Sequence, residues 1–340
     1  MDTPSLKQAT SATVQIVPQL GLDGGVAMVV IVKQMFAVDR RGRVTRVGGA
    51  EIRLADEPWD PDSPETSSVR LPSDVCIRKP STDVVVVGAA VGVYRPRVTH
   101  LDVLVRVGPV LKALRVFGQR VWCRGAASLA LTAPEPFESL PLRWEYAYGG
   151  FDSSDPANPL EEPRNPVGCG VTRKGASLVD KAAPRIEDPA NLIASERTRP
   201  APAGVGALGR HWEPRRRYVG TMDERWLRER VPLLPHDFDD RYNQLATPEL
   251  ITPMPLVGGE PLHVLNMCEE GSIECELPRI AFFVGARFDD GPLKEFRPML
   301  DTVLVLPNAR RFEMTWRSAI PTPAPARRLR YVQVHEKEIL

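Results

Sequence analysis

Two short groups of carboxylates beside aromatic residues come closest to a catalytic pair in this sequence. Trp144-Glu145-Tyr146 places one carboxylate between two rings, and Asp237-Phe238-Asp239-Asp240 places three carboxylates beside one ring. Two carboxyl groups about 5–10 Å apart would suit the hydrolysis of a glycosidic bond. The chain has 43 acidic residues, so such proximity also arises by chance, and solvated loops or helix caps explain it equally well.

Other signatures of catalysis are absent from the sequence. No nucleophile elbow, paired-histidine zinc motif, phosphate-binding loop or dinucleotide-binding glycine motif occurs. Cys268, Cys275 and His263 are the only grouping that hints at a metal, and no second ligand pair accompanies them. We therefore expect no catalytic residue, no metal ligand and no cofactor.

A basic and aromatic segment is the other feature with chemical potential. Residues 195–230 hold nine arginines and five acids, a net charge of +4, and include His211-Trp212-Glu213-Pro214-Arg215-Arg216-Arg217-Tyr218. Such a run can bind phosphate or nucleic acid, pair with acids of the same chain, or form a protein interface. Because the whole chain carries only +1, we favour the second and third interpretations together and expect no nucleic-acid partner.

The elements that must position these residues are mainly β. Residues 25–37 are rich in β-branched residues, and residues 100–107 alternate apolar and polar side chains. A hairpin is predicted between 40–46 and 51–55 around Gly48–Gly49. Further strands are predicted at 83–93, 110–117, 119–124, 128–132, 262–267, 272–277, 280–288, 302–306, 311–317 and 329–334. Short strands separated by turns predict antiparallel sandwich or barrel-like sheets.

The middle of the chain differs from both ends. Residues 130–262 carry 18 of the 34 prolines, and 148–219 lack a sustained helical or strand period. Short helices are predicted at 222–230, with Thr221 as N-cap, and at 238–245. The sequence predicts a β-rich part (1–147), a long irregular Pro/Gly-rich insertion with a few short helices (148–250), and a second β-rich part (251–340) packed on the first.

Composition bears on the cellular compartment. The amino terminus lacks a basic start followed by an apolar stretch, and the apolar run 26–32 is too short to cross a bilayer. The five cysteines are few, odd in number and scattered, unlike a disulfide framework. We expect a reduced, cytoplasmic protein without membrane insertion.

Several phrases occur in a particular order along the chain. They are Lys79-Pro80-Ser81-Thr82-Asp83-Val84, Val116-Phe117-Gly118-Gln119-Arg120-Val121-Trp122, Pro141-Leu142-Arg143-Trp144-Glu145-Tyr146-Ala147-Tyr148-Gly149-Gly150, Asn165-Pro166-Val167-Gly168-Cys169-Gly170, Pro202-Ala203-Gly204 with Gly209 and Trp212, Gly220-Thr221-Met222-Asp223 with Trp226, Leu234-Pro235-His236-Asp237-Phe238-Asp239, Leu256-Val257-Gly258-Gly259-Glu260, and Leu265-Asn266-Met267. Their order resembles a bacterial domain-of-unknown-function family of type VI secretion accessory proteins, over about residues 15–290. Gln119 and Tyr148 depart from the family pattern, which has Asp and Phe at these positions.

The resemblance implies a non-enzymatic adaptor or chaperone. Members of that family are commonly encoded beside VgrG-type spike proteins, PAAR-tip proteins and Rhs-type toxins, so the implied partners are a toxin effector and components of the VgrG/PAAR spike. The candidate partner-binding residues are those of the phrases and of the basic run: Trp144, Glu145, Tyr146, Tyr148, Gly149, Gly150, Asn165, Pro166, Gly168, Gly170, Trp212, Arg215, Arg216, Arg217, Asp223, Trp226, Asp237, Phe238 and Asp239.

Three alternatives stay open. Most phrase residues can instead hold the shape of the insertion, because glycines permit unusual backbone angles and buried tryptophans anchor irregular segments. The protein can be a carbohydrate-binding or glycoside-processing β protein, in which Trp144, Glu145, Asp237 and Asp239 line a groove. It can also be a structural component of the injection apparatus.

Overall fold

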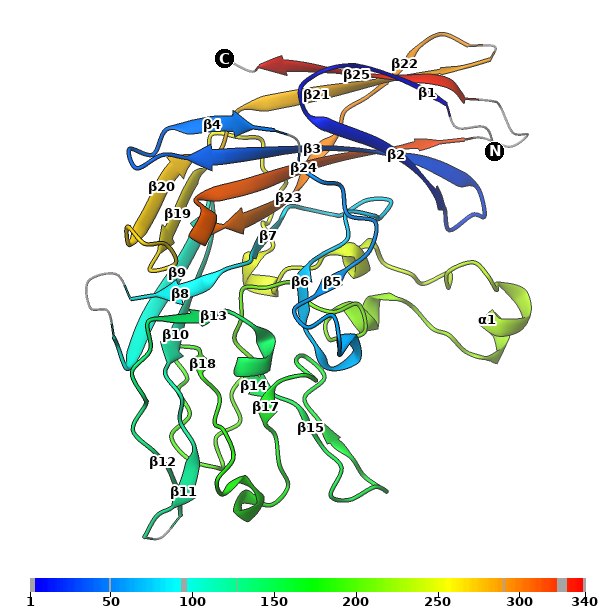
Figure 1. Ribbon diagram of the computed structural model, residues 1–340. Helices are drawn as coiled ribbons and strands as arrows, with labels where there is room; N and C mark the ends of the chain where they lie inside the picture. Colours follow the sequence, from blue (N-terminus) through cyan, green and yellow to red (C-terminus); the bar gives the residue numbers. More distant parts are fainter. Residues whose placement is uncertain are drawn as a thin grey trace.

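A computed structural model of the chain describes residues 4–48, 50–92, 97–126, 128–289, 291–322 and 329–338. The prediction of a mainly β fold is confirmed: the described residues form several sheets, none of them closed into a barrel, with one short α-helix (Figure 1). Among the described residues, no helix has the length and apolar character that crossing a bilayer requires.

Two sheets pack face to face in the upper part of Figure 1. The four-stranded sheet has the order β1-β25-β21-β22, and the six-stranded sheet has the order β2-β3-β24-β23-β7 with β4 also paired to β3. Phe282 and Trp316 meet edge to face between them, with ring centroids 4.8 Å apart. The strands are β1 (Ser5–Ala9), β2 (Thr13–Leu20), β3 (Val26–Val38), β4 (Val44–Val47), β7 (Asp83–Val86), β21 (Ile280–Phe288), β22 (Lys294–Phe296), β23 (Met299–Leu306), β24 (Arg311–Pro321) and β25 (Leu329–Glu338).

A third sheet continues below the first two. Its order is β18-β10-β9-β19-β20, with β9 (His100–Val107), β10 (Val110–Phe117), β18 (Ile186–Glu187), β19 (Pro261–Leu265) and β20 (Ser272–Glu276). The turn of the β9–β10 hairpin contains Gly108 at a positive φ of 53°, a conformation that glycine adopts without steric cost. Alternate residues of β9 are buried, as the alternation in its sequence predicts.

The described elements outside these three sheets are short. Paired strands of two or three residues are β5 (Glu57–Pro58) with β6 (Val69–Leu71), β8 (Ala89–Val91) with β13 (Ser139–Pro141), β11 (Trp122–Arg124) with β12 (Leu129–Leu131), β14 (Tyr148–Gly149) with β17 (Cys169–Gly170), and β15 (Phe151–Asp152) with β16 (Leu160–Glu161). The helix α1 is Glu224–Glu229, and 3₁₀ turns lie at Pro64–Thr66, Trp144–Tyr146, Gly175–Leu178, Arg215–Tyr218, Asp240–Asn243, Pro248–Leu250 and Pro307–Ala309.

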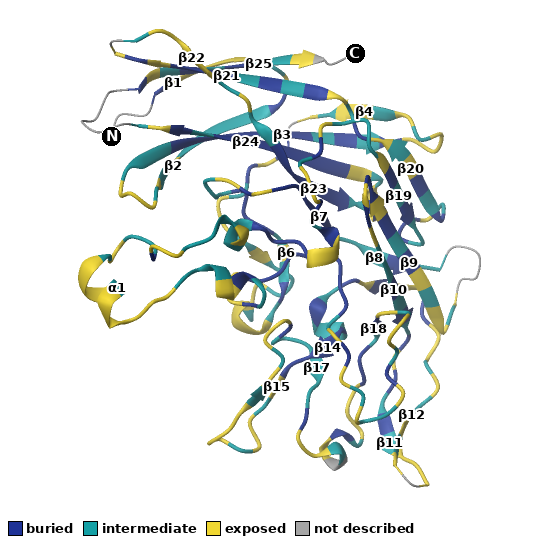
Figure 2. Ribbon diagram, turned by 180° about the vertical axis from the view of Figure 1, so that it is seen from behind, coloured by how far each residue is buried: buried dark blue, intermediate teal, exposed yellow. Residues whose placement is uncertain are grey.

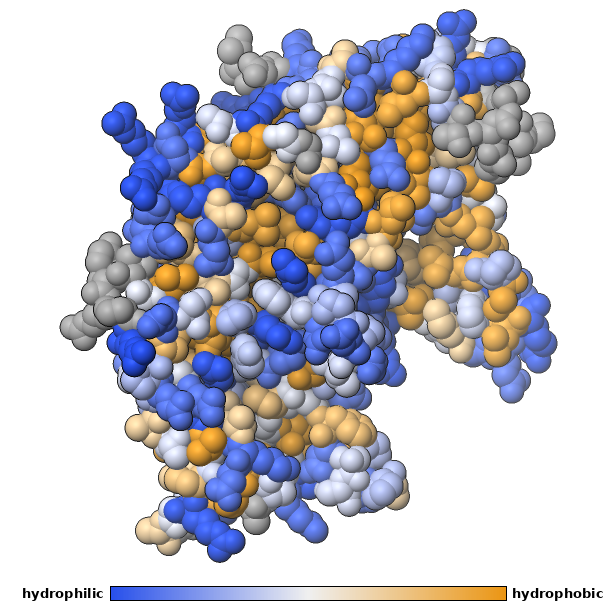
Figure 3. Space-filling view, in the orientation of Figure 1, coloured by the Kyte–Doolittle hydropathy of each residue, from blue (hydrophilic) through white to orange (hydrophobic). Residues whose placement is uncertain are grey.

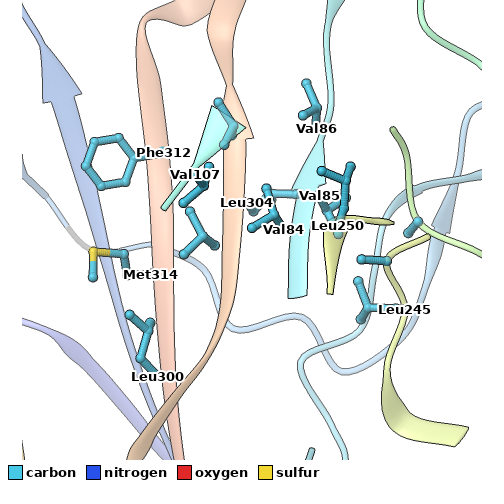
Figure 4. Packing of buried hydrophobic residues seen from close by; sticks show 14 of the residues in the cluster. Val84, Val85, Val86, Val107, Leu245, Leu250, Leu300, Leu304, Phe312 and Met314 are labelled. Carbon is cyan, nitrogen blue, oxygen red and sulfur yellow. The ribbon is translucent and has the colours of Figure 1, made fainter. Parts of the chain in front are cut away.

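Residues of the middle segment join the same core as the sheets. Figure 4 shows Leu250 packed beside Val84 and Val85 of β7, and Leu245 belongs to the same buried cluster. Figure 2 shows β7 and β23 in dark blue, as buried strands. The carboxylate of Asp83 accepts hydrogen bonds from the backbone N–H groups of residues 245 and 246, at 3.1 and 3.3 Å. The division of the chain at 147/148 and 250/251 stays a prediction.

A buried group of charges attaches segment 50–79 to the second face of the six-stranded sheet. Lys33 of β3 lies 2.7 Å from Asp74 and 3.0 Å from Glu313 of β24. Arg53 donates two hydrogen bonds to Glu313, at 2.8 and 2.9 Å. Burial alone would raise the pKa of Glu313, but the hydrogen bonds from Arg53 and the charge of Lys33 outweigh burial and lower it. Glu313 therefore stays ionised against its two cations.

A second buried group explains the phrase at residues 79–84. Lys79 donates to Asp83 at 2.8 Å and to Thr302 Oγ1 at 2.7 Å, and Thr82 Oγ1 donates to the carbonyl of residue 300. Nearby, the fully buried Arg317 is paired with Asp301. The phrase thus serves to join β7, β23 and the middle segment.

Two local predictions are wrong. The hairpin between 40–46 and 51–55 does not form: β4 pairs with β3 instead, and 51–55 contain no strand. Segment 51–55 instead crosses the sheet face, where the N–H of Arg53 donates to Asp74 at 2.8 Å. Gly49 of that predicted hairpin, and Val93 at the end of the predicted strand 83–93, lie outside the described residues. Asp223, not Thr221, caps α1, because its carboxylate accepts the N–H of Trp226 at 2.8 Å.

Candidate partner-binding site

Two tryptophans of the phrases form the anchor of the irregular segment. Trp144 and Trp212 are 3% and 1% exposed, and their rings meet edge to face with centroids 5.8 Å apart. A Cβ at Gly204 would lie 2.7 Å from the Trp144 ring, and a Cβ at Gly209 would lie 2.7 Å from Trp212 Nε1. Glycine is required at both positions because the indole rings lie directly against the backbone. These four phrase residues therefore act in packing.

Asn165 ties the loop between β14 and β17 together. Its side chain is fully buried, and its Nδ2 donates to the carbonyls of Trp144 and Tyr148 at 2.9 and 3.0 Å. Its own carbonyl accepts the N–H groups of Gly150 and Gly168, at 2.8 and 3.3 Å. One asparagine thus replaces the hydrogen bonds that a regular sheet would supply.

The chain packs so closely around Asn165 that the neighbouring glycines have no room for a larger side chain. Gly149, Gly150 and Gly170 have φ values of 157°, 100° and 100°, and a Cβ at Gly149 or Gly168 would lie within 3 Å of Asn165 atoms. Pro166 follows Asn165 and is half-buried. The phrase residues of this loop thus maintain its conformation.

The predicted carboxylates are used in hydrogen bonds within the chain. Glu145 accepts the N–H and Oγ of Ser68 at 2.9 and 2.7 Å, and pairs with Arg143 at 3.0 Å. Burial would raise the pKa of Glu145, but the hydrogen bonds from Arg143 and Ser68 lower it. Asp237 accepts the N–H and hydroxyl of Thr221 at 2.9 and 2.7 Å.

Asp239 accepts hydrogen bonds from the backbone and guanidinium of Arg241, at 2.8 and 2.6 Å. A glycosidase pair needs two carboxyl groups free to face a sugar. These carboxylates are thus engaged in bonds within the chain, and the carbohydrate alternative stays a prediction. The described residues contain no group of three or more His, Cys, Asp or Glu that could hold a metal ion.

The basic run divides into residues with different roles. Arg215 is buried and donates to the carbonyls of Leu208 and Tyr242, at 2.6 and 3.0 Å. Burial lowers its pKa. Arg216 is exposed, and Arg217 pairs with Glu213 at 2.8 Å. Part of the run therefore pairs within the chain, as one interpretation of the sequence expects.

The remaining aromatic candidates pack locally. Tyr148 is buried in a small separate core, and Arg185 lies over the ring of Tyr146 at 5.1 Å. Phe238 meets Tyr242 edge to face at 5.7 Å. Trp226 donates through Nε1 to the carbonyl of Leu233 at 2.9 Å.

Residues 219–238 form an arm that carries α1 away from the body (Figures 1 and 2). Its base is closed by the bond from the N–H of Asp239 to the carbonyl of Tyr218, at 3.0 Å. Farther out, Arg230 donates to the carbonyl of Leu22 in the β2–β3 turn, at 2.7 Å. The arm leaves three apolar side chains half or more exposed: Met222 (50%), Leu227 (60%) and Val231 (51%).

A pocket of about 360 Å³ lies where the arm begins. Trp144, Pro202 and Leu208 supply apolar lining, and Tyr218 lines it at the base of the arm. Of the predicted site residues, the pocket brings together Trp144 and Arg217, while Glu145, Asn165 and Asp237 lie outside its lining. Lys112, Arg164 and Glu249 also line it, although they were not among the residues expected from the sequence. Only Arg164, next to Asn165, adjoins one of the phrases.

A second hollow, of about 620 Å³, is lined by four glycines of the phrases, Gly149, Gly150, Gly168 and Gly170. Asp152 lies there and accepts the N–H groups of Arg173 and Ser154, both at 2.8 Å. These bonds lower the pKa of Asp152. Its carboxylate is thus committed to the shape of the loop.

Comparisons with known proteins give one result. Neither the curated proteins nor the solved structures contain a chain that matches this one. A model of a bacterial protein family, described as "Uncharacterized protein conserved in bacteria (DUF2169)", matches residues 23–317. Because this match covers most of the chain, the protein belongs to the DUF2169 family.

Proposed function

We propose that the protein is a non-enzymatic, cytoplasmic adaptor or chaperone that binds a toxin effector of type VI secretion and helps to load it onto the VgrG/PAAR spike. The type VI assignment rests on the ordered phrases of the sequence. The proposal that the ligand is a polypeptide rests on the surface of the arm.

One observation carries the polypeptide proposal: an ordered arm exposes Met222, Leu227 and Val231 to solvent. Orange, apolar atoms are visible on the arm at the right of Figure 3. Clustered apolar side chains on a surface are characteristic of sites that contact another protein. The carboxylates that catalysis would need are meanwhile bonded within the chain. Such an arrangement suits binding more than chemical transformation.

The experiment is co-expression of a type VI toxin encoded beside the gene, with and without this protein. An adaptor is expected to co-purify with the toxin and to raise its soluble fraction. Unchanged toxin solubility together with no co-purification would contradict the proposal. Stoichiometric recovery of the protein in exported spike particles would instead favour a component of the injection apparatus.

A matched pair of variants tests the arm. Leu227 and Leu54 are both 60% exposed, and Leu54 lies in the segment that covers the six-stranded sheet. Leu227→Glu is expected to weaken co-purification of the toxin, whereas Leu54→Glu is expected to leave it unchanged. Equal effects of the two substitutions would rule out the arm as the contact surface.

A further inference from the structure

The pocket at the base of the arm has an apolar floor and a charged rim. Trp144, Pro202 and Leu208 lie in its apolar lining, and its volume of about 360 Å³ is sufficient for one large side chain of a ligand. Tyr218 lines the pocket and immediately precedes the arm, so the pocket adjoins the base of the arm.

The rim has a positive part. Arg164 pairs with Glu162 at 2.6 Å, and Arg217 pairs with Glu213 at 2.8 Å. In both pairs the cation is the more exposed partner: 48% against 12%, and 60% against 22%. The N–H of Glu213 donates to the carbonyl of Pro163 at 2.8 Å, which brings the two arginine-bearing segments together. This part of the rim therefore presents guanidinium groups to a ligand.

A different part of the rim is negative. Lys112 of β10 pairs with Glu249 at 3.0 Å, but here the carboxylate is 58% exposed and the lysine only 11%. Burial would raise the pKa of Glu249, but the charge of Lys112 and the hydrogen bonds from Lys112, Thr247 and the backbone together outweigh burial and lower the pKa, so the group is ionised at neutral pH. A ligand thus meets arginines on one part of the rim and a carboxylate on another.

We propose that this pocket binds an extended peptide segment of the partner, which inserts one large apolar side chain. An acidic residue of the segment lies at Arg164 and Arg217, and a basic residue lies at Glu249. The proposal rests on the function proposed above and specifies where the partner is held. Trp, Tyr and Arg in a partly enclosed pocket are the residues that contribute most to protein–protein affinity.

The alternative of a phosphorylated or other polyanionic ligand fits the rim less well. Each rim cation already has a carboxylate partner within 3.0 Å, so a polyanion would meet Glu213 and Glu249 as well as the cations. A segment that carries both charges avoids this repulsion.

The test uses blocked synthetic peptides and the full chain. The probe is the acetylated, amidated heptapeptide Gly-Asp-Ala-Phe-Ala-Lys-Gly, whose charged residues lie about 13 Å apart when extended. Its companions carry Gly in place of Phe, two Asp, or two Lys, and free phenylalanine is a further comparison. Binding is measured by titration calorimetry at low salt, where exposed charges are least screened.

Two protein variants separate the pocket from the rest of the surface. Ala201 is exposed and lines the pocket, so Ala201→Phe fills the space without disturbing the core. Ala157 is an exposed residue between β15 and β16, and Ala157→Phe is the matched control. Equal melting temperatures of both variants and the wild type establish that any loss of binding is local.

We expect saturable binding of the Phe peptide, at least about tenfold weaker when Phe is replaced by Gly, since burial of an aromatic side chain is worth that factor or more. Ala201→Phe is expected to weaken binding about tenfold, and Ala157→Phe is expected to have no effect. Glu249→Lys is expected to shift the preference toward the peptide with two Asp, by up to about fivefold.

Three outcomes would overturn the proposal. They are no peptide binding at millimolar concentration, binding that Ala201→Phe leaves unchanged, and binding of free phenylalanine as tight as that of the peptide. If one of these occurs while a toxin still co-purifies with the wild-type protein, the pocket assignment is wrong and the adaptor function stands. If toxin co-purification fails as well, both are wrong.

Discussion

The substitution Asn165→Ala tests whether buried side chain to backbone bonds hold the irregular segment in place. It removes the bonds from Nδ2 to the carbonyls of Trp144 and Tyr148. The Trp144 carbonyl keeps a second bond, from the N–H of Ala147 at 3.0 Å, so its loss is about 0.5–1.5 kcal/mol. The Tyr148 carbonyl loses the bond that Asn165 supplies, and a buried acceptor left unpaired costs about 1–3 kcal/mol. The sum is about 1.5–4.5 kcal/mol.

The assay is the thermal midpoint of unfolding, followed by calorimetry. At roughly 2 °C per kcal/mol for a chain of this size, we expect the midpoint to fall by about 3–9 °C. Limited proteolysis is expected to cleave first within residues 151–200, because Asn165 fixes that segment to the Trp144–Tyr148 backbone. The matched control is Asn158→Ala at an exposed turn, for which a change below about 0.5 kcal/mol is expected.

This account would be refuted if Asn165→Ala had the same unfolding midpoint as the Asn158→Ala control and were cleaved by protease no faster than that control. Loss of the bonds would then cost nothing, and the irregular segment would have to owe its shape to apolar packing alone. An Asn165→Asp variant distinguishes the two cases further, because a carboxylate beside two carbonyl oxygens adds repulsion. We expect Asn165→Asp to be at least as destabilising as Asn165→Ala.

Three further predictions concern stability. Because the folded-state pKa of Glu145 is lowered, the ionised group contributes fully to folding stability above the ordinary pKa of about 4.3, and this contribution is lost as pH falls through the folded-state value. The melting temperatures of wild type and Glu145→Gln should therefore converge toward about pH 3. Plots of melting temperature against pH that stay parallel would contradict this. Gly204→Ala places a methyl group 2.7 Å from the Trp144 ring and should cost about 1–3 kcal/mol in urea unfolding, whereas Gly48→Ala, with open space around its Cβ, should be neutral. Arg317→Met leaves Asp301 buried without its partner and should cost about 3–5 kcal/mol, and a midpoint within 1 °C of wild type would contradict the buried pair.

The strands could be predicted from the sequence because their signal is local. β3 is rich in β-branched residues and β9 alternates apolar and polar residues, and both patterns follow directly from the two faces of a strand. Charged residues in strands are usually exposed to solvent, but Lys33 and Glu313 are 1% exposed. Their burial depends on segment 50–79 covering the sheet, which no short window of sequence reveals.

The irregular segment could not be predicted for a related reason. Its conformation depends on bonds between distant residues, such as Asp83 to residues 245 and 246, or Asn165 to Trp144. The ordered phrases contain at least one partner of each of these bonds, but they do not reveal which distant residue is the other partner. The pocket at the base of the arm is lined by five separate stretches of chain, near residues 112, 144, 164, 201–218 and 247–249. No single stretch of sequence therefore predicts its lining.

The same bonds explain why phrase residues and contact residues should separate in a mutational experiment. Asn165, Trp212 and Arg215 are buried and bonded within the chain, so their substitution acts first on folding and only indirectly on a partner. Leu227 and Glu249 are exposed, so their substitution can alter binding at constant stability. Under the proposed function, a partner is therefore expected to contact side chains of the second kind. In this chain the buried residues of the phrases form a scaffold, and under the proposed function, specificity for a polypeptide would reside in the exposed side chains.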